Sequence, residues 1–386
     1  MTNTVLEPTP TSTSLSPKST IFTLTSESVS EGHPDKVCDY IADSILDAYV
    51  AQEPHSRVAC EVLCKENTVV LGGEISSGAR VGHQDVVREA IREIGYTDHT
   101  CAFNADKVQI IEILSKQSSD IARGVDADKN VDHEQGAGDQ GIMFGYATDE
   151  TPELMPLPIL LAHRLTRGLA EDRKSGRYSW LGPDAKSQVS ILYEGNTPLS
   201  VTDVLVSTQH STHIPQAGIR KYVEETLAPN VLGKWFHHDI RFAVNPTGNF
   251  VHGGPSADCG VTGRKIIADT YGGAAHHGGG AFSGKDPSKV DRSGAYFARH
   301  VARQIVKKGL AKRAEIQVAY AIGLAKPVSV KVDTFGTGDN PTAVEFVRTF
   351  DFRPAAIVEQ LDLLRPIYRL TTNYGHFGKS NLRWEQ

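Results

Sequence analysis

The segment between residues 57 and 75 constrains the fold of this chain most strongly, because it predicts two antiparallel strands joined by a tight turn. Arg57 to Lys65 and Thr68 to Ile75 both have strand-like patterns, and only Glu66-Asn67 separates them. Elsewhere, strand-like and helix-like segments are mixed without the strict alternation of a doubly wound parallel sheet. The sequence therefore predicts an α+β fold.

The register of this hairpin determines which side chains share a face of the sheet. Pairing Lys65 with Thr68 places Glu61 and Glu74 on the same face. Two acids there indicate either a solvated face or a site for a cation and an amine, and hairpin geometry leaves both interpretations open.

A helix is predicted to begin at Pro34, within the segment Ser28 to Lys36. Proline suits the first helical position, and apolar residues recur every three or four positions at Val37, Ile41, Ile45 and Ala48. Free N–H groups at a helix start attract an oxyanion, and Asp35 there could hold a divalent cation beside the imidazole of His33. An ordinary well-capped helix has the same residues, and this segment alone favours that simpler interpretation.

Other periodic segments predict the remaining elements. The predicted helices cover Asp85 to Ile94, Ile159 to Glu171, Gln216 to Leu227 and a long segment that Asp286-Pro287 caps and starts and Gly309 ends. The predicted strands lie near Gln188 to Tyr193, Val201 to Thr208, Glu315 to Ile322 and Val328 to Phe335.

Length and composition limit the class of protein. A chain of 386 residues exceeds one ordinary core and predicts about two or three domains. The net charge of −6 argues against a nucleic-acid-binding protein, and no apolar run approaches the ~20 residues of a membrane span. Five cysteines fit the reduced thiols of a cytoplasmic protein.

Cys60 and Cys64 share one strand face as small core residues and lack the second pair that a zinc site needs.

Two segments are predicted to lack regular structure. Residues 1–20 are rich in Thr, Ser and Pro, which predicts a disordered tail without the features of a secretory signal or a transit peptide. Gln117 to Glu134 is polar and rich in turn residues, so it is either a mobile lid or a plain linker, and composition slightly favours the linker.

Two glycine-rich motifs look like nucleotide-binding loops but differ in detail. Gly136 to Gly141 fits G-x-G-x-x-G, yet polar residues precede it and an extended segment follows, so it predicts only a tight turn presenting Asp139. Gly279 to Lys285 fails the P-loop pattern, because Asp286 stands where a Ser or Thr should bind magnesium. The glycine loop, Lys285 and the following helix start still predict a phosphate cradle.

The surroundings of this second loop also bear on its ligand. Basic residues gather there at Arg264, Lys265, Lys285 and Lys289. His276 and His277 are not expected to form a metal pair, because adjacent side chains on a glycine loop rarely point the same way. The loop is therefore predicted to meet an anionic ligand with local positive charge.

Together, several of these segments resemble one known family. They are Glu31 to Lys36, Gly136 to Gly141, Asp184 to Gln188, Gly263 to Lys265 and Gly278 to Lys289. In this order they resemble S-adenosylmethionine synthetase, also called methionine adenosyltransferase, over roughly residues 21–386. The resemblance implies that the sulfur of L-methionine attacks C5′ of ATP and that the displaced triphosphate is hydrolysed to phosphate and diphosphate.

The resemblance also implies an architecture. It implies three similar α/β-sandwich-like domains, with mixed sheets packed under helices in a pseudo-threefold arrangement. The expected segments are the tail 1–20, an N-terminal domain 21–120, a mobile loop or linker 121–134, a central domain 135–252 and a C-terminal domain 253–386. A cytoplasmic homodimer with shared active sites is expected, with dimers pairing into a tetramer.

Individual roles follow from the same resemblance. The leaving triphosphate is expected to meet six basic side chains, here called the cation clamp: His33, Lys186, Arg264, Lys265, Lys285 and Lys289. All but Lys265 of these are also expected to be catalytic. Further ATP contacts are implied for Asp184, Phe250, Asp258 and Ala281, with Phe250 stacking on adenine. Methionine contacts are implied for Glu74, Gln117, Asp139, Asp258 and Lys289.

The same resemblance implies metal ligands, and one alternative function is kept beside the synthetase. Asp35 and Asp291 match magnesium ligands, with two ions per site, and Glu61 matches a potassium-linked position. The alternative is a noncatalytic ATP-binding regulatory subunit of the same fold. That alternative predicts the loss of catalytic side chains, and none of them is missing from the sequence.

Overall fold

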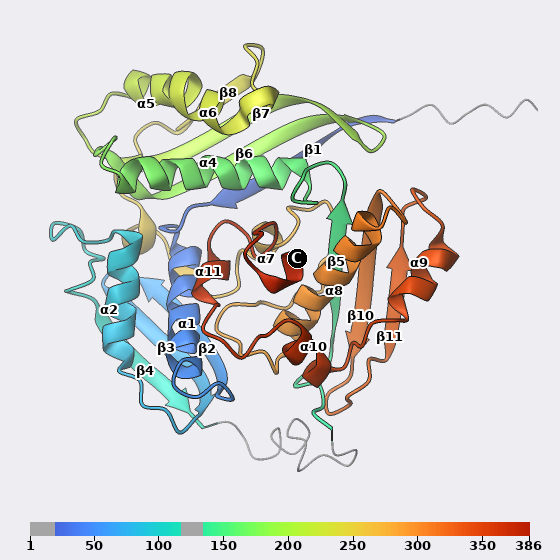
Figure 1. Cartoon of the computed structure of the whole chain (residues 1–386). Coiled ribbons are helices and arrows are strands. Elements are labelled where there is room, and N and C mark those ends of the chain that lie inside the picture. The colour runs from blue at the N-terminus through green and yellow to red at the C-terminus, as the bar shows by residue number, and fades with distance from the viewer. Residues whose placement is uncertain (1–19, 117–133) are drawn as a thin grey trace, which may run out of the picture.

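The computed structural model describes residues 20–116 and 134–386. These residues form three sheets with long helices packed on them, arranged around a centre that holds the C-terminal segment (Figure 1). All but the last residue of the expected tail 1–20 and of the expected loop 121–134 lie outside the described residues. Within the described ranges, no helix is both long and apolar enough to cross a membrane.

The first sheet has the strand order β4-β3-β2-β9. Its strands are β2 (Arg57–Lys65), β3 (Thr68–Ser76), β4 (Gln109–Ser115) and β9 (Gly260–Val261). The predicted hairpin register is confirmed, because Glu61 lies opposite Gly72 and Glu74 lies opposite Ala59. The buried face of β2 packs against α1 (Pro34–Val50), and α2 (His83–Ile94) packs beside α1. Cys60 and Cys64 are buried in this core, as predicted.

The second sheet has the strand order β1-β6-β7-β8. Its strands are β1 (Ile21–Val29), β6 (Leu181–Glu194), β7 (Thr197–His210) and β8 (Arg241–Val244). One face is covered by α4 (Leu157–Lys174) together with α5 (Gln216–Tyr222), a π-helical turn (Val223–Leu227) and α6 (Ala228–Leu232). The helix predicted over Gln216 to Leu227 therefore changes its hydrogen-bond pattern midway instead of running as one α-helix.

The third sheet has the strand order β11-β10-β5. Its strands are β5 (Gly141–Thr148), β10 (Arg313–Tyr320) and β11 (Ser329–Asp333). Helix α8 (Val290–Lys307) packs across β5 and β10, α9 (Asn340–Val347) lies against β11, and α10 (Pro354–Gln360) lies against α8. Short helical segments complete the chain at Gly233–Trp235, Gly254–Ser256, α7 (Ile266–Asp269), α11 (Arg369–Thr372) and Arg383–Glu385.

The three sheets exchange strands in a cyclic order. Strand β1, the first of the chain, pairs with β6 of the second sheet, and β5 pairs with β10 of the third. Strand β9, which follows β8 in the chain, returns to pair with β2 of the first sheet. The chain therefore consists of three successive units, beginning at β1, β5 and β9, and the first strand of each unit pairs within the sheet of another unit. This pairing connects the three units. The three related sheets agree with the predicted α+β class.

One sequence prediction about a helix start is wrong. Helix α8 begins at Val290 and not at Pro287, with Lys289 in the cap position. The carboxylate of Asp286 accepts backbone hydrogen bonds from Val58 at 2.8 Å and from Ser288 at 2.9 Å. The predicted phosphate cradle therefore does not have a helix start directly after Lys285.

Candidate active site

The start of α1 forms one side of the candidate site. His33 is the cap residue, and its Nδ1 accepts a hydrogen bond of 3.2 Å from the backbone N–H of Asp35. Burial, followed by the charges of Lys265 and Lys186, lowers the pKa of His33 to about 3. The imidazole is therefore neutral, and because Nδ1 accepts, Nε2 carries the proton and can donate to a ligand.

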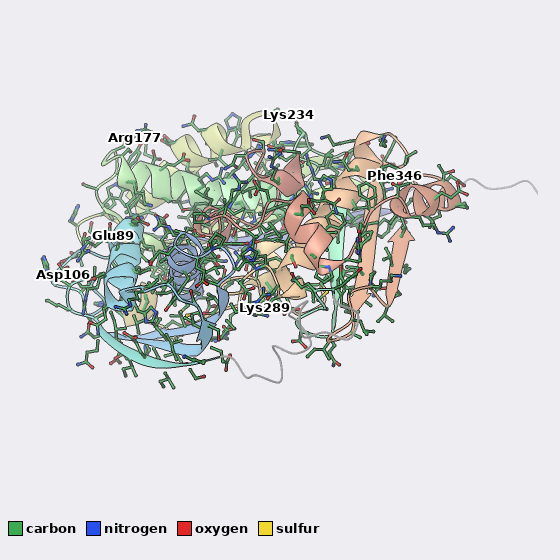
Figure 2. The ribbon with its side chains drawn as sticks, turned by 60° about the horizontal axis from the view of Figure 1, so that its bottom comes forward. Glu89, Asp106, Arg177, Lys234, Lys289 and Phe346 are labelled. Carbon is green, nitrogen blue, oxygen red and sulfur yellow. The ribbon has the colours of Figure 1, made fainter. Side chains whose placement is uncertain are left out.

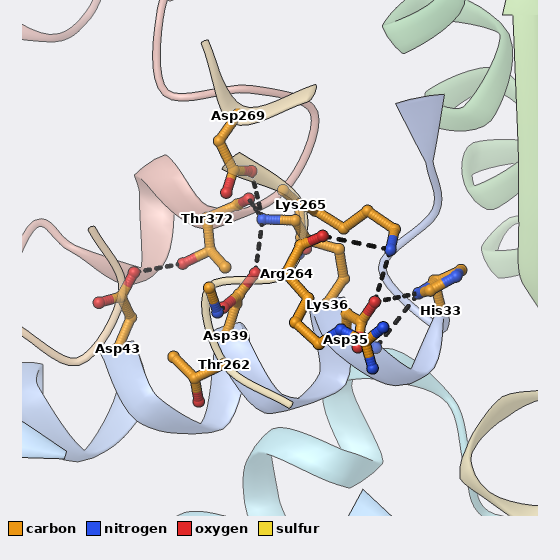
Figure 3. A network of polar contacts seen from close by, with 12 residues as sticks. His33, Asp35, Lys36, Asp39, Asp43, Thr262, Arg264, Lys265, Asp269 and Thr372 are labelled. Atoms are coloured by element: carbon orange, nitrogen blue, oxygen red, sulfur yellow. Dashed lines mark hydrogen bonds and ion pairs between the residues drawn. The ribbon is translucent and has the colours of Figure 1, made fainter. Parts of the chain in front are cut away.

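Asp35 links this helix start to a segment far along the chain. Its carboxylate accepts from the backbone N–H of Val261 at 3.0 Å and from Nζ of Lys265 at 2.5 Å. Burial works to raise the pKa of Asp35, but these two hydrogen bonds and the lysine charge lower it overall. Figure 3 shows Lys265 reaching across to Asp35 beside His33. The exposed Arg264 precedes Lys265 on the same segment.

A second side comes from β6, where Asp184 and Lys186 lie next to the end of β1. The buried Asp184 accepts from the backbone N–H of Gly254 at 2.8 Å, and burial raises its pKa to about 6 despite that bond and the charge of Lys186. A Cβ on Gly253 would lie 3.0 Å from the ring of Phe250 and 3.1 Å from Cβ of Asp184. The glycine therefore allows an aromatic ring and this carboxyl group to share one small region.

A third side contains the glycine loop and the start of α8. Nζ of Lys285 lies 2.6 Å from Oδ2 of Asp291, and Lys289 pairs with the buried Asp286. A Cβ on Gly280 would lie 2.4 Å from Oδ1 of Asp291, so the loop passes directly over this carboxylate. Figure 2 shows Lys289 at the junction between the first and third units.

Close packing connects this loop with the Lys265 segment. A Cβ on Gly263 would lie 2.5 Å from Cβ of Ala281, and Gly263 has a φ of 75°. Only glycine allows this approach without displacement of one segment. Arg264 and Lys265 therefore come from backbone that contacts the glycine loop itself.

The two acids of the hairpin lie at the edge of the same region. Loss of hydration, followed by the charges of Asp39 and Glu74, raises the pKa of Glu61, and the nearby ammonium of Lys285 only partly offsets them. These mutual effects agree with Glu61 and Glu74 sharing one sheet face close to Lys285. Both side chains are nevertheless exposed, so this geometry fits a solvated face as well as a site for cations.

Sequence reasoning missed a buried polar network behind the site. Lys36 is buried, its Nζ lies 2.9 Å from Oδ2 of Asp39, and it also pairs with Asp269 (Figure 3). It donates to the backbone carbonyl of Thr372 at 3.1 Å as well. The available signal was the spacing of acids along α1, since Asp39 follows Asp35 by four residues on a helix with an apolar face.

Some predicted residues are not joined to the others by a described contact. Within the described ranges, the exposed Asp139 accepts from the adjacent N–H of Gln140, and Asp258 accepts from the N–H of Cys259 while its charge adds to the raised pKa of Asp184. Gln117 lies outside the described residues. His276 contacts Glu315 while His277 accepts from Gly279, so the two rings diverge as predicted.

The candidate metal ligands Asp35 and Asp291 lie in a sparse set of donor side chains. In residues 20–116 and 134–386, no three His, Cys, Asp or Glu side chains gather as a ready metal cage. Asp35 and Asp291 nevertheless present carboxylate oxygens, each beside a lysine, on the two sides of the site. Hard ions such as Mg²⁺ fit such sparse carboxylates when a phosphate ligand supplies further oxygens.

Comparisons with known proteins cover nearly the whole described chain. Family models described as the N-terminal, central and C-terminal domains of S-adenosylmethionine synthetase match residues 21–119, 134–250 and 252–386. The S-adenosylmethionine synthase of Sorangium cellulosum (strain So ce56) is 53% identical over 369 residues, which cover 95% of this chain and 87% of the relative.

Proposed function

Because this chain belongs to the S-adenosylmethionine synthetase family, we propose that it makes S-adenosylmethionine, phosphate and diphosphate from ATP, L-methionine and water. The observation that carries the proposal is the convergence of the α1 start at His33 with Lys265 and Lys285, which lie more than two hundred residues later in the sequence. The sulfur of methionine attacks C5′ of ATP and displaces the triphosphate. A thioether has no proton to lose, so the reaction needs no general base.

The residues of the cation clamp stabilise the triphosphate as it leaves. Negative charge grows on the oxygen that leaves C5′, and donors placed there in advance lower the barrier. We assign the Nε2 proton of the neutral His33 to this oxygen. The five remaining members of the clamp hold the triphosphate chain: Lys186, Arg264, Lys265, Lys285 and Lys289.

Substrate positioning falls to the residues around the clamp. Phe250 stacks on adenine, and the closeness of its ring and Asp184 to Gly253 supports this assignment. Asp258 and Ala281 border the nucleotide, and Glu74 pairs with the ammonium group of methionine. We assign the other methionine contacts to Gln117, Asp139, Asp258 and Lys289.

Asp35 and Asp291 are the residues that would hold magnesium, two ions per site, and Glu61 would hold potassium. Bound cations of this kind neutralise phosphate charge and orient the triphosphate. Lys265 pairs with Asp35 and Lys285 with Asp291, so each of these carboxylates already lies beside a clamp lysine. The exchange of a lysine for a cation at each carboxylate would free both ammonium groups for the triphosphate.

A homodimer with shared active sites is the proposed assembly. Leu63, Ile111 and Ile113 lie on the same sheet face as Glu61 and Glu74, and Ile113 is 66% exposed. An apolar face around two functional acids is typical of a surface that a second copy covers. We propose further that dimers pair into tetramers in the cytoplasm, with no nucleic-acid or membrane partner.

The test separates catalysis from binding alone. The purified chain is incubated with ATP, methionine, Mg²⁺ and K⁺, and a sulfonium product is sought by mass spectrometry. The synthetase forms it, whereas a noncatalytic regulatory subunit binds ATP without turnover. Binding of ATP with no sulfonium product would therefore refute the proposal.

A further inference from the structure

Four aspartates on α1 form a row that contacts the later part of the chain. They are Asp35, Asp39, Asp43 and Asp47, here called the α1 aspartate row. A spacing of four residues puts them on one helix face. Each accepts at least one backbone N–H, from Val261, Gly263, Gly284 and the Tyr368–Arg369 pair respectively.

Asp39 holds the backbone directly before two members of the cation clamp. Its Oδ1 accepts from the N–H of Gly263 at 2.8 Å, and its Oδ2 lies 2.9 Å from Nζ of Lys36. Arg264 and Lys265 follow Gly263 immediately. The carboxylate thus fixes the point from which both side chains extend.

Asp43 does the same for the glycine loop through a buried ion pair. Its Oδ1 accepts from the N–H of Gly284 at 2.9 Å, and Arg292 donates to its two oxygens at 2.7 and 2.9 Å. The same guanidinium donates to the backbone carbonyl of Lys285 at 3.2 Å. Asp43 and Arg292 are both fully buried, so water does not compete for these contacts.

Strand β2 fixes the opposite side of this segment. Gly284 accepts from the N–H of Cys60 at 3.0 Å, and Asp286 donates to the carbonyl of Val58 at 3.0 Å. Gly284 has a φ of 80°, and a Cβ there would lie 2.0 Å from the carbonyl oxygen of Cys60. The backbone at Lys285 is therefore held from two directions, and its side chain alone remains to turn between Asp291 and a ligand.

We propose that Asp39 and Asp43, the latter acting with Arg292, are positioning residues that set where Lys265 and Lys285 meet the triphosphate. The inference rests on the proposed function. Neither aspartate needs to touch the substrate, because each acts through the backbone of a clamp residue. A displacement of about 1 Å at a positioned group can cost on the order of 10²-fold in rate.

Asp47 provides an internal comparison for this proposal. It lies on the same helix face and accepts the N–H groups of Tyr368 and Arg369, both at 2.9 Å. Those residues lead into α11 and carry no member of the clamp. Loss of Asp47 removes the same kind of contact from a segment that carries no clamp residue and reaches the Asp43–Arg292 pair through the hydroxyls of Thr371 and Thr372.

The experiment compares two matched replacements in the full chain. The double variant Asp43→Leu with Arg292→Met removes the ion pair as a unit, so that no buried charge is left alone. Asp47→Leu is the control. The measured quantities are kcat, the KM for ATP and the hydrolysis of added tripolyphosphate, at a temperature where circular dichroism shows each variant folded.

We expect the double variant to lose kcat for both reactions on the order of 10²-fold. The control melts at a lower temperature but keeps the parent kcat and KM. A folded double variant with parental kinetics overturns the proposal, as does an equal kinetic loss in the control. If the double variant does not fold, the variant Asp39→Leu tests the proposal instead, because Lys36 keeps Asp269 as an ion-pair partner in that variant. The proposal then requires that folded Asp39→Leu has a lower kcat than the parent. An inactive parent would refute the proposed function instead.

Discussion

The backbone N–H of Asp35 donates a 3.2 Å hydrogen bond to Nδ1 of His33, and this contact assigns the imidazole its tautomer. Burial and the charges of three nearby lysines lower the pKa of His33 to about 3, so the ring is neutral in the free protein. His33 therefore enters the cation clamp as a neutral donor through Nε2. The remaining members carry the positive charge.

Replacement of His33 by asparagine tests this role. Asparagine is also a good helix cap, so His33→Asn should leave the melting temperature near that of the parent. The rate of adenosyl transfer should fall by about 10²–10³-fold, because one donor to the leaving oxygen is lost. Single-turnover kinetics measure this rate. A raised KM for ATP with an unchanged kcat would show that His33 only binds the nucleotide.

Lys285 should contribute mainly to the binding and hydrolysis of the triphosphate. Lys285→Met removes one clamp charge and leaves Asp291 without its 2.6 Å partner. We expect a KM for ATP raised by about tenfold or more and a slower hydrolysis of tripolyphosphate. The exposed Lys326 supplies the control, since Lys326→Met removes the same charge elsewhere. Equal kinetics in the two variants would remove Lys285 from the clamp.

The exposed apolar sheet face should be the dimer contact. Ile113→Asp places a charge on that face and should convert the dimer into an inactive monomer, as measured by light scattering after size exclusion. Leu370→Asp is a matched control, because Leu370 is 61% exposed and Ile113 is 66% exposed. Retention of the dimer by the Ile113 variant would place the contact elsewhere.

Asp47 should make stability depend on pH in a defined direction. Burial raises its pKa from 3.8 to about 6, against the backbone hydrogen bonds that it accepts. The folded state then binds the proton more tightly, so this contribution is complete below the unfolded pKa and is lost as pH rises through about 6. The loss amounts to about 3 kcal/mol.

The variant Asp47→Asn mimics the protonated carboxyl group and lacks this titration. Its unfolding free energy, measured with urea, should rise relative to that of the parent between about pH 4 and pH 6. Parallel curves for the two proteins over this range would contradict the raised pKa.

Local sequence features predicted the elements that local forces define. The two-residue turn at Glu66-Asn67 set the register of β2 and β3, and Pro34 with its apolar repeat predicted α1. Tertiary contacts decided the rest. The chain around Asp286 has the residues of a helix start, yet the carboxylate of Asp286 bonds to the backbone of Val58 on β2 and the helix begins at Val290.

The candidate site was predictable as a set of residues but not as a geometry. The pairing of Lys265 with Asp35 joins positions 230 residues apart, and no periodicity reports such a contact. The neutrality of His33 also depends on burial and on charges that later segments supply. The strand exchange that places β9 beside β2 brings the Lys265 segment to α1, and it is a property of the whole fold.

The central claim is that this chain couples adenosyl transfer to triphosphate hydrolysis, and the stoichiometry of one turnover tests it most directly. With enzyme in excess over ATP and with methionine, Mg²⁺ and K⁺ present, quenched samples are analysed for all nucleotides and phosphates. The account predicts equal amounts of S-adenosylmethionine, phosphate and diphosphate. Formation of ADP together with phosphate would contradict the account. Release of phosphate in a sample that lacks methionine, with no sulfonium product, would also contradict it.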